Sequence, residues 1–269
     1  EGVLLKTVDG GTTWSRRESG TTQNLTAMTI KPDGNLSING GGKQLTVDDQ
    51  TDKYSVKMYY DRLGRVVASQ NSKQHAMRPQ RFSYTVYDAL GRNVEAGELE
   101  SDAEPTEAMI NATDTRFPDN WSHKRYQVIR SVYDEPIYGE SADDSVRQAF
   151  GEGGQQHLRN RIATTLYQEV YNPSSRVYNH ATHYSYDIYG NVSTLVHDIR
   201  ELGKVGQRFK RIDYDYDLIS GKVNQLDYQK GQPDGYSLRY EYDGENRLTR
   251  VLANYQGDES WNELARYEY

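Results

Sequence analysis

The 269-residue sequence contains no cysteine. This absence excludes disulfides, thiolate metal sites and cysteine nucleophiles together. Aliphatic residues are also scarce: Leu, Ile, Val and Phe number 18, 10, 18 and 4, so they make up 50 of 269 residues. Such a composition is typical of disordered chains when the net charge is high. Here the formal net charge is only −7 and the chain adds 23 tyrosines, so we expect a folded protein in which tyrosine supplies much of the core.

Long apolar runs and targeting signals are missing as well. No stretch reaches the roughly 20 apolar residues of a membrane span, so we expect no membrane span. The opening residues lack a Met, a basic region and an apolar region, which indicates a piece of a longer polypeptide. The isoelectric point near 5.5 argues against a nucleic-acid partner.

A Tyr-Asp pair recurs along the chain. The six pairs end at Asp61, Asp88, Asp134, Asp187, Asp217 and Asp243, at steps of 27, 46, 53, 30 and 26 residues. Two steps are roughly double the rest, so the middle of the chain carries insertions or degenerate copies, and we expect an irregular insertion at about 99–156. Within it, residues 141–151 read as a short helix that ends at Gly151. Tyr269 lies 27 residues after Tyr242, where the next repeat is expected.

Each repeat predicts a β-hairpin. Before the Asp, tyrosine alternates with polar residues, which places both tyrosines on one face of a strand. After the Asp, a glycine or asparagine three residues on, or four in the longer Asp217 copy, fits a type I turn followed by a left-handed residue and a G1 bulge. The strand positions are Tyr184, Tyr186, Tyr214, Tyr216, Tyr240 and Tyr242. The turn positions are Asp61 and Gly64, Asp88 and Gly91, Asp187 and Gly190, Asp217 and Gly221, and Asp243 and Asn246. Hairpins in series predict an all-β fold, a curling antiparallel sheet.

This pattern resembles the YD repeats of the RHS family, whose motif is roughly Tyr-x-Tyr-Asp-x-x-Gly-Arg-Leu. Tyr184 to Val192 follows it closely, and together with Leu158 to Arg161 it resembles RHS proteins of Bacteroidota. The resemblance covers residues 53–269. It implies part of a hollow β-shell: in bacterial RHS proteins and insecticidal toxin complexes the shell encloses a toxic C-terminal segment, and in teneurins a similar shell supports adhesion.

The first 52 residues differ. Thr7, Asp9, Gly11 and Trp14 match the Asp-box Ser/Thr-x-Asp-x-Gly-x-x-Trp, which resembles the turn of a BNR-type propeller blade. One blade cannot close a propeller of four to eight. Residues 1–52 are therefore either the tail of a propeller that continues upstream or a lone blade-like hairpin.

Two groups of residues could hold a metal ion, and both are weak candidates. Asp213, Asp215 and Asp217 alternate along a strand and could hold calcium, but a solvated strand face is the better interpretation. His180 and His183 have a spacing that suits zinc on a helix, whereas this stretch reads as a strand. We therefore expect no catalytic residue, metal or cofactor.

Three functions follow from the sequence. The first is a non-catalytic wall segment of a large secreted or bacterial cell-surface RHS protein, which encloses or presents a toxin or other segment of its own polypeptide. The second is an adhesin module that binds a cell-surface protein or glycan through its aromatic face. The third, suggested only by the association of the Asp-box with sialidases, is a glycosidase fragment.

Overall fold

The structure is a computed structural model of the chain. It describes residues 56–112, 117–122, 124–137, 144–171, 177–255 and 260–269, and before them only the backbone of five short strands. Contacts divide the chain into two compact units. The first contains Glu1–Lys57 and Gln70–Gln80, and the second contains Met58–Ser69 and Arg81–Tyr269. The division into 1–52 and 53–269 stays a prediction.

The first unit contains two small antiparallel sheets. Strands β1 (Leu4–Lys6) and β2 (Ser15–Arg17) form one, and β3 (Leu25–Ile30), β4 (Leu36–Gly40) and β5 (Lys43–Val47) form the other. The Asp-box residues Thr7, Asp9, Gly11 and Trp14 lie outside the described residues. The unit also contains the short helix α1 (Ser72–Ala76), which begins with a capping box between Asn71 and Gln74.

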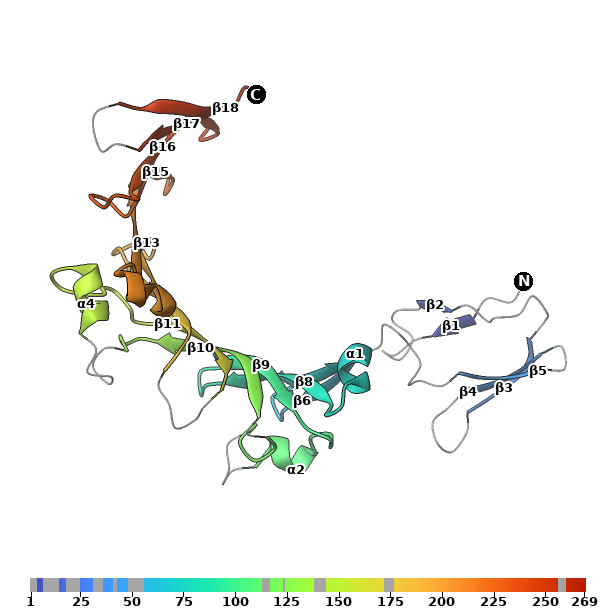
Figure 1. Cartoon of the computed structure of the whole chain (residues 1–269). Coiled ribbons are helices and arrows are strands. Elements are labelled where there is room, and N and C mark those ends of the chain that lie inside the picture. Colours follow the sequence, from blue (N-terminus) through green and yellow to red (C-terminus); the bar gives the residue numbers. More distant parts are fainter. Residues whose placement is uncertain are drawn as a thin grey trace. The chain divides into compact units, whose positions relative to one another are not determined.

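The second unit is dominated by one open, curling sheet, and the predicted all-β fold is confirmed (Figure 1). Thirteen strands lie side by side in sequence order, each antiparallel to its neighbours. They are β6 (Val56–Tyr60), β7 (Val66–Asn71), β8 (Arg81–Tyr87), β9 (Asn93–Glu100), β10 (Arg125–Tyr133), β11 (Ile162–Val170), β12 (His180–Tyr186), β13 (Val192–Ile199), β14 (Phe209–Tyr216), β15 (Val223–Tyr228), β16 (Tyr236–Tyr242), β17 (Leu248–Asn254) and β18 (Asn262–Arg266). In this meander the Tyr-Asp turns, including the long β10–β11 connection that starts at Asp134, lie at one end of the strands, and the other connections lie at the opposite end.

Short helices interrupt the connections. Helix α2 (Glu107–Ile110) lies between β9 and β10, α4 (Ser145–Phe150) between β10 and β11, and the 3-10 helix η2 (Arg200–Val205) between β13 and β14. The expected insertion at 99–156 is thus two excursions with β10 between them. Helix α4 begins later than the pattern predicts, and residues 141–143 lie outside the described residues. It ends at Gly151, whose φ is +83°.

The sheet has two unlike faces. In β12, Ala181, His183 and Ser185 are buried, while the alternating Tyr184 and Tyr186 are half-buried on the other side. Directly paired residues of neighbouring strands share a face, so the register assigns the residues of each further strand to one of these two sides. We call the side of Tyr184, Tyr186, Tyr214, Tyr216, Tyr240 and Tyr242 the tyrosine face, and the side of Phe82, Leu99, His183 and Val196 the covered face.

The buried core lies on the covered face. Trp121 from the α2 excursion packs edge-on against Phe82 at 4.8 Å, and Phe150 of α4 packs against Val196. Among the described residues, only Tyr84 and Tyr178 are buried tyrosines, so the expectation of a largely tyrosine core is wrong. A buried tyrosine hydroxyl needs a hydrogen-bond partner, and the tyrosines of the repeats find this partner while they stay half-buried at the sheet surface.

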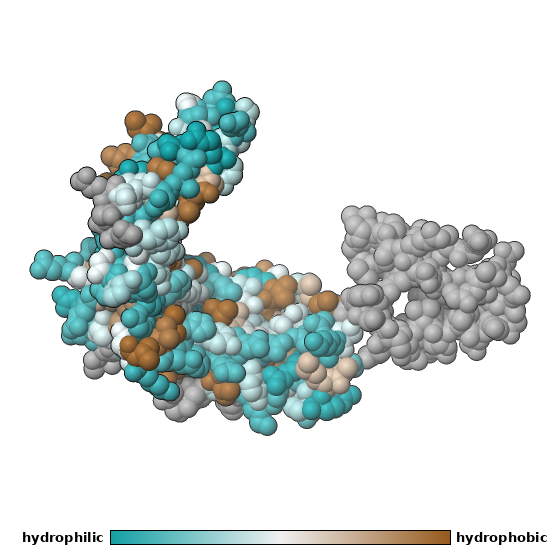
Figure 2. Space-filling model, turned by 45° about the horizontal axis from the view of Figure 1, so that its top comes forward, coloured by the Kyte–Doolittle hydropathy of each residue, from teal (hydrophilic) through white to brown (hydrophobic). Residues whose placement is uncertain are grey.

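Hydrophilic side chains cover most of the visible surface of the described residues, and hydrophobic ones form small separate groups (Figure 2). Within the part of the chain that the structure describes, no helix has both the length and the apolar character needed to cross a membrane.

Candidate functional site

The recurring feature of the second unit is the turn that follows each Tyr-Asp pair. In the β6–β7 hairpin, the Gly64 N–H donates to the Asp61 carbonyl and the Asp61 N–H donates to the Arg65 carbonyl, both at 3.0 Å. Gly64 has φ +74°, a conformation that glycine adopts without a Cβ penalty. This is the geometry of a type I turn closed by a left-handed residue.

The other turns repeat these two bonds. The same pairs join Asp88 to Gly91 and Arg92, Asp187 to Gly190 and Asn191, and Asp243 to Asn246 and Arg247. The Asp217 turn has one more residue, so its N–H reaches the carbonyl of Lys222 at 2.8 Å, and Gly221 is left-handed with φ +68°. In the Asp243 turn, Asn246 takes the glycine's place with φ +62°. A register shift marks the strand just before four of these turns, at Tyr87, Tyr186, Tyr216 and Tyr242.

The Asp side chain holds the turn from inside. Asp61 Oδ1 accepts the N–H groups of Leu63 and Arg65 at 2.9 Å, and Asp61 Oδ2 accepts Arg65 Nε at 2.7 Å. Burial raises the pKa of Asp61, but the hydrogen bonds from Arg65 and Leu63 outweigh it and hold the pKa below its usual value. The carboxylate is therefore a structural acceptor that is fully used within its own hairpin.

The third repeat is an expanded copy of this turn. The Asp134 N–H donates to the Arg161 carbonyl at 3.1 Å, as the Asp61 N–H does to that of Arg65. The Asn160 N–H donates to Asp134 Oδ1, and Asn160 takes the left-handed position with φ +60°. The excursion that carries α4 is thus inserted inside a Tyr-Asp turn, with Asn160 and Arg161 closing it.

A ladder of tyrosine hydroxyls joins consecutive hairpins. From the second Tyr-Asp pair onward, the tyrosine of each pair donates its O–H to a backbone carbonyl of the preceding hairpin, and Tyr269 does the same. The acceptor lies two residues after the left-handed residue of that preceding hairpin. The six bonds measure 2.8–3.1 Å and run from Tyr87 to Val66, Tyr133 to Asn93, Tyr186 to Ile162, Tyr216 to Val192, Tyr242 to Val223 and Tyr269 to Leu248. Tyr269 thus occupies the position of a repeat tyrosine, and each repeat is tied to its neighbour in the same way.

Arginine reinforces the ladder. The guanidinium that follows the left-handed residue stacks over the repeat tyrosine of the next hairpin, at 4.2–5.3 Å from the ring centre. The pairs are Arg65 with Tyr87, Arg92 with Tyr133, Arg161 with Tyr186 and Arg247 with Tyr269. A cation over an aromatic ring contributes about 0.5–1 kcal/mol at exposed sites. Asn191 and Lys222 replace the arginine after the other two turns.

The strand tyrosines are paired along each strand. The rings of Tyr184 and Tyr186 stack at 6.5 Å, and those of Tyr214 and Tyr216 at 6.2 Å. Tyr240 and Tyr242 lie on the same face of β16 and are half-buried. Burial raises the pKa of Tyr186 and of Tyr216, so their hydroxyls stay protonated as donors.

The acidic strand β14 does not gather its carboxylates around one point. Asp213 pairs with Arg211 at 2.8 Å, Asp215 accepts a bond from Asn224 at 3.2 Å, and Asp217 accepts N–H groups of its own turn. Within the described ranges, no group of three His, Cys, Asp or Glu residues could hold a metal ion. Asp213 and Asp217 are half-buried and only Asp215 is exposed, so the predicted solvated face holds for Asp215 alone.

The two histidines of β12 lie on opposite faces. His180 stacks on Tyr167 at 4.6 Å on the tyrosine face, whereas His183 is fully buried on the covered face. They cannot ligate one ion together, because alternate strand positions point away from each other.

A buried polar network surrounds His183. Its Nδ1 lies 2.9 Å from Thr164 Oγ1, and its Nε2 lies 3.9 Å from Asp198 Oδ2, beyond hydrogen-bond distance. Tyr178 and Arg208 donate to Asp198 at 2.6–2.8 Å. Burial opposes ionisation of Asp198, but His183, Arg208 and Tyr178 together hold the pKa of this carboxyl well below its usual range. The Thr-His-Asp order is that of a catalytic triad, yet all three residues have no exposed surface, so the network binds strands together.

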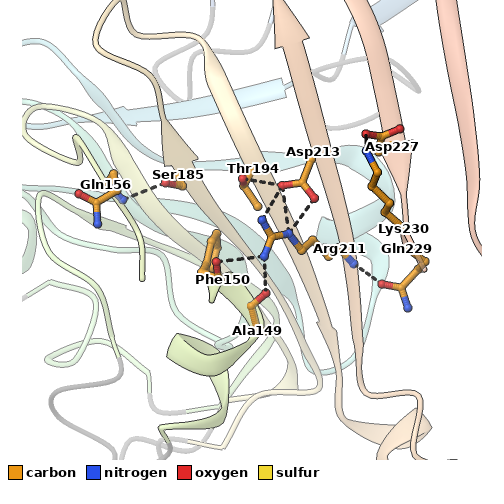
Figure 3. Close-up of polar contacts among 10 residues, drawn as sticks. All are labelled: Ala149, Phe150, Gln156, Ser185, Thr194, Arg211, Asp213, Asp227, Gln229 and Lys230. Carbon is orange, nitrogen blue, oxygen red and sulfur yellow. Dashed lines mark hydrogen bonds and ion pairs between the residues drawn. The ribbon is translucent and has the colours of Figure 1, made fainter. Parts of the chain in front are cut away.

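Arg211 fastens α4 to the covered face (Figure 3). Its Nη1 donates to the carbonyls of Ala149 and Phe150, the last residues of the helix, at 3.3 and 3.0 Å. Its Nε and Nη2 bind Asp213, which also accepts from Thr194 Oγ1 at 2.8 Å. The excursion is thereby anchored to β13 and β14, which belong to the next two hairpins after its own.

Sequence reasoning missed the stacked arginine, the hydroxyl ladder and the turn of the third repeat. The stacked arginine and the third turn had a signal in the sequence: a left-handed Gly or Asn followed by Arg. Asn160-Arg161 repeats the dipeptides Gly64-Arg65, Gly91-Arg92 and Asn246-Arg247. The ladder had none, since the acceptor is a backbone carbonyl.

These features define a class of protein: an open, single-layered antiparallel sheet of turn-closed hairpin repeats, tied repeat to repeat by tyrosine hydroxyls. No protein-family model and no curated protein matches the chain. Among solved structures, it is similar to the Tc holotoxin pore of Photorhabdus luminescens, with 13% identity and a TM-score of 0.39 over 85% of this chain and 11% of that chain. It is also similar to the TcdB2-TccC3 complex, with 13% identity and a TM-score of 0.39 over 87% of this chain and 12% of that chain. A porin-like protein from Bacteroides uniformis is 10% identical with a TM-score of 0.21 over 88% of this chain and 91% of that chain. The chain thus spans only about a tenth of the toxin chains' length.

Proposed function

We propose that this chain is a non-catalytic wall segment of a large, secreted or cell-surface RHS-type protein, and that the wall encloses or presents a C-terminal toxin or another segment of the same polypeptide. The observation that carries the proposal is the hydroxyl ladder. It joins six consecutive hairpins by one contact of nearly constant length. A uniform link between repeats extends a wall by addition of units, as in other repeat proteins.

The chemistry of the repeated residues supports a structural role. The recurring carboxylates accept hydrogen bonds from their own turns, and the recurring tyrosine hydroxyls donate to neighbouring hairpins. Residues used in this way are not free to bind substrate or transfer protons. The partners under this proposal are the remaining parts of the protein's own polypeptide.

The proposal is tested on the polypeptide encoded by the complete reading frame. Limited proteolysis followed by mass spectrometry compares its C-terminal segment within the full protein and expressed alone. We expect strong protection within the full protein, and loss of protection when Gly190→Val weakens the wall. Equal cleavage of the segment in both settings would refute enclosure.

The alternative is an adhesin that binds glycan or protein through the tyrosine face. The stacked, half-buried rings of Tyr228 and Tyr236, 5.0 Å apart, favour it because aromatic platforms bind sugar rings. Screening the 269-residue chain on a glycan array, with Tyr236→Ala as the comparison, separates the two. Saturable binding that the substitution abolishes would support the adhesin and count against a simple wall.

A further inference from the structure

Six of the most exposed large apolar side chains of the second unit lie at the Tyr-Asp turns. They occupy the first or second position after the Asp, between it and the left-handed residue. They are Leu63 (76% exposed), Leu90 (71%), Ile188 (71%), Tyr189 (65%), Leu218 (77%) and Ile219 (97%). We call them the turn-tip row. All belong to turns at the same end of the strands of one sheet, because the strands form an uninterrupted antiparallel meander.

The turn itself does not require these side chains. The Asp243 turn makes the same backbone bonds with Gly244 and Glu245 at the corresponding positions. Polar residues and glycine are the usual occupants of such positions. Four turns that instead expose Leu, Ile or Tyr present apolar surface to something outside the hairpin, since isolated exposed apolar residues are ordinary but a row of them is not.

The row has two parts, the tips of the Asp61 and Asp88 turns and those of the Asp187 and Asp217 turns, because the expanded Asp134 turn that carries α4 lies between them. Consecutive hairpins advance by two strands, so neighbouring turns lie about 10 Å apart along the edge. A partner that fits every tip must carry apolar groups at the same repeat distance. The turns of a second copy of the sheet have that spacing. A two-fold axis would bring the two identical rows together, with the tips of one row between the tips of the other.

The apolar area is that of a stable interface. Burying a leucine or isoleucine side chain removes on the order of 100 Å² from water, so six tips supply roughly 600 Å². A standard interface buries about 800 Å² on each partner, a little over half of it apolar. The row alone therefore provides the apolar part of a standard-size interface.

We propose that the turn-tip row is a self-association surface, and that its occupant is the turn-tip row of a second copy of this chain. The turn-tip row lies at the ends of the strands and not on a face of the sheet. The proposed dimer therefore does not depend on whether the wall encloses another segment.

Sedimentation equilibrium of the full 269-residue chain tests the proposal. We expect a monomer–dimer equilibrium that weakens by about tenfold or more for Leu90→Asn, and more for the combination with Leu218→Asn and Ile219→Asn. The matched control is Val205→Asn, which changes an apolar residue of similar exposure (69%) at the opposite edge and should leave the dimer unchanged. Far-UV circular dichroism confirms that each variant is folded.

A second measurement locates the contact. Because the chain has no cysteine, Leu90→Cys and Val205→Cys each introduce a single thiol. A thiol-specific cross-linker should join two copies through position 90 and not through position 205. A wild-type chain that stays monomeric, a dimer that the tip substitutions leave intact, or cross-linking equal at both positions would overturn the proposal. Flotation of a monomeric chain with phosphatidylglycerol vesicles, lost in the tip variants, would overturn it in favour of a lipid occupant.

Discussion

Tyr186→Phe tests the hydroxyl ladder with the smallest possible change. The substitution removes only the oxygen whose O–H donates to the Ile162 carbonyl at 2.8 Å. The ring remains, so its stacking on Tyr184 and its contact with the Arg161 guanidinium remain as well. The experiment therefore isolates one bond between two hairpins.

The expected loss follows from the environment of the bond. A net intramolecular hydrogen bond contributes about 0.5–1.5 kcal/mol to stability. Tyr186 is half-buried, so water can replace part of the lost contact, and we expect about 0.5–1 kcal/mol. For a domain of this size that corresponds to a decrease in Tm of roughly 1–4 °C.

Tyr184→Phe is the matched control. Tyr184 lies on the same strand and the same face, and among the described residues no hydrogen bond of its hydroxyl is found. We expect its free energy of unfolding to be unchanged within about 0.3 kcal/mol. Urea denaturation followed by circular dichroism measures both variants, and an unchanged m-value shows that the unfolded states are comparable.

The ladder also predicts additivity. Repeats lie about 10 Å apart, so the effects of tyrosine-to-phenylalanine changes in different repeats should add within about 0.5 kcal/mol. Replacing all six ladder tyrosines should cost about 3–6 kcal/mol, a large part of the stability of an ordinary domain. Equal stability of the Tyr184 and Tyr186 variants would refute the ladder as a source of stability.

Three further changes test the turns and the α4 anchor. Gly190→Val places a β-branched residue at φ +99° with its Cβ 2.8 Å from the Arg161 side chain, so it should lower the free energy of unfolding by more than about 1 kcal/mol in a urea titration. Gly244 has open space around it and no positive φ, so Gly244→Val should cost less in the same titration. Burial raises the pKa of Asp187, but hydrogen bonds from its own turn outweigh it and lower this pKa, so the unfolded chain binds more protons in acid. Stability should therefore fall as the pH drops below about 4, and Asp187→Asn should flatten that dependence in acid titrations; an identical slope would contradict it. Arg211→Met removes the bonds to the last carbonyls of α4, and hydrogen exchange of that helix should accelerate while the exchange of β12 stays the same.

The fold class could be predicted because its signals are local. A Tyr-x-Tyr-Asp-x-x-Gly stretch contains both the strand period and the turn residues, so Asp187 and Gly190 mark a hairpin within a few positions. The same locality explains the failure at the third repeat. Asp134 and Asn160 close one turn across an excursion that contains α4, and no short-range pattern connects them.

The division of the sheet into two faces was less accessible. Alternation placed Tyr184 and Tyr186 on one side, but it could not tell which side the excursions would cover. That depends on long-range contacts, such as Trp121 on Phe82 and Arg211 on the carbonyls of α4. The tyrosines were therefore expected in the core, whereas they lie half-buried on the uncovered face.

The high tyrosine content compensates for the scarcity of aliphatic residues. A sheet without a second layer cannot bury leucine on both faces, and an exposed leucine strand would aggregate along its face. A half-buried tyrosine covers the backbone with its ring and still satisfies its hydroxyl at the preceding hairpin, as Tyr216 does at Val192. The arginine over the next ring adds attraction between repeats without adding apolar surface, as Arg65 does over Tyr87. Stability in this protein thus comes from contacts between neighbouring repeats along the sheet, which explains how a chain with only 50 Leu, Ile, Val and Phe residues maintains thirteen strands in one sheet.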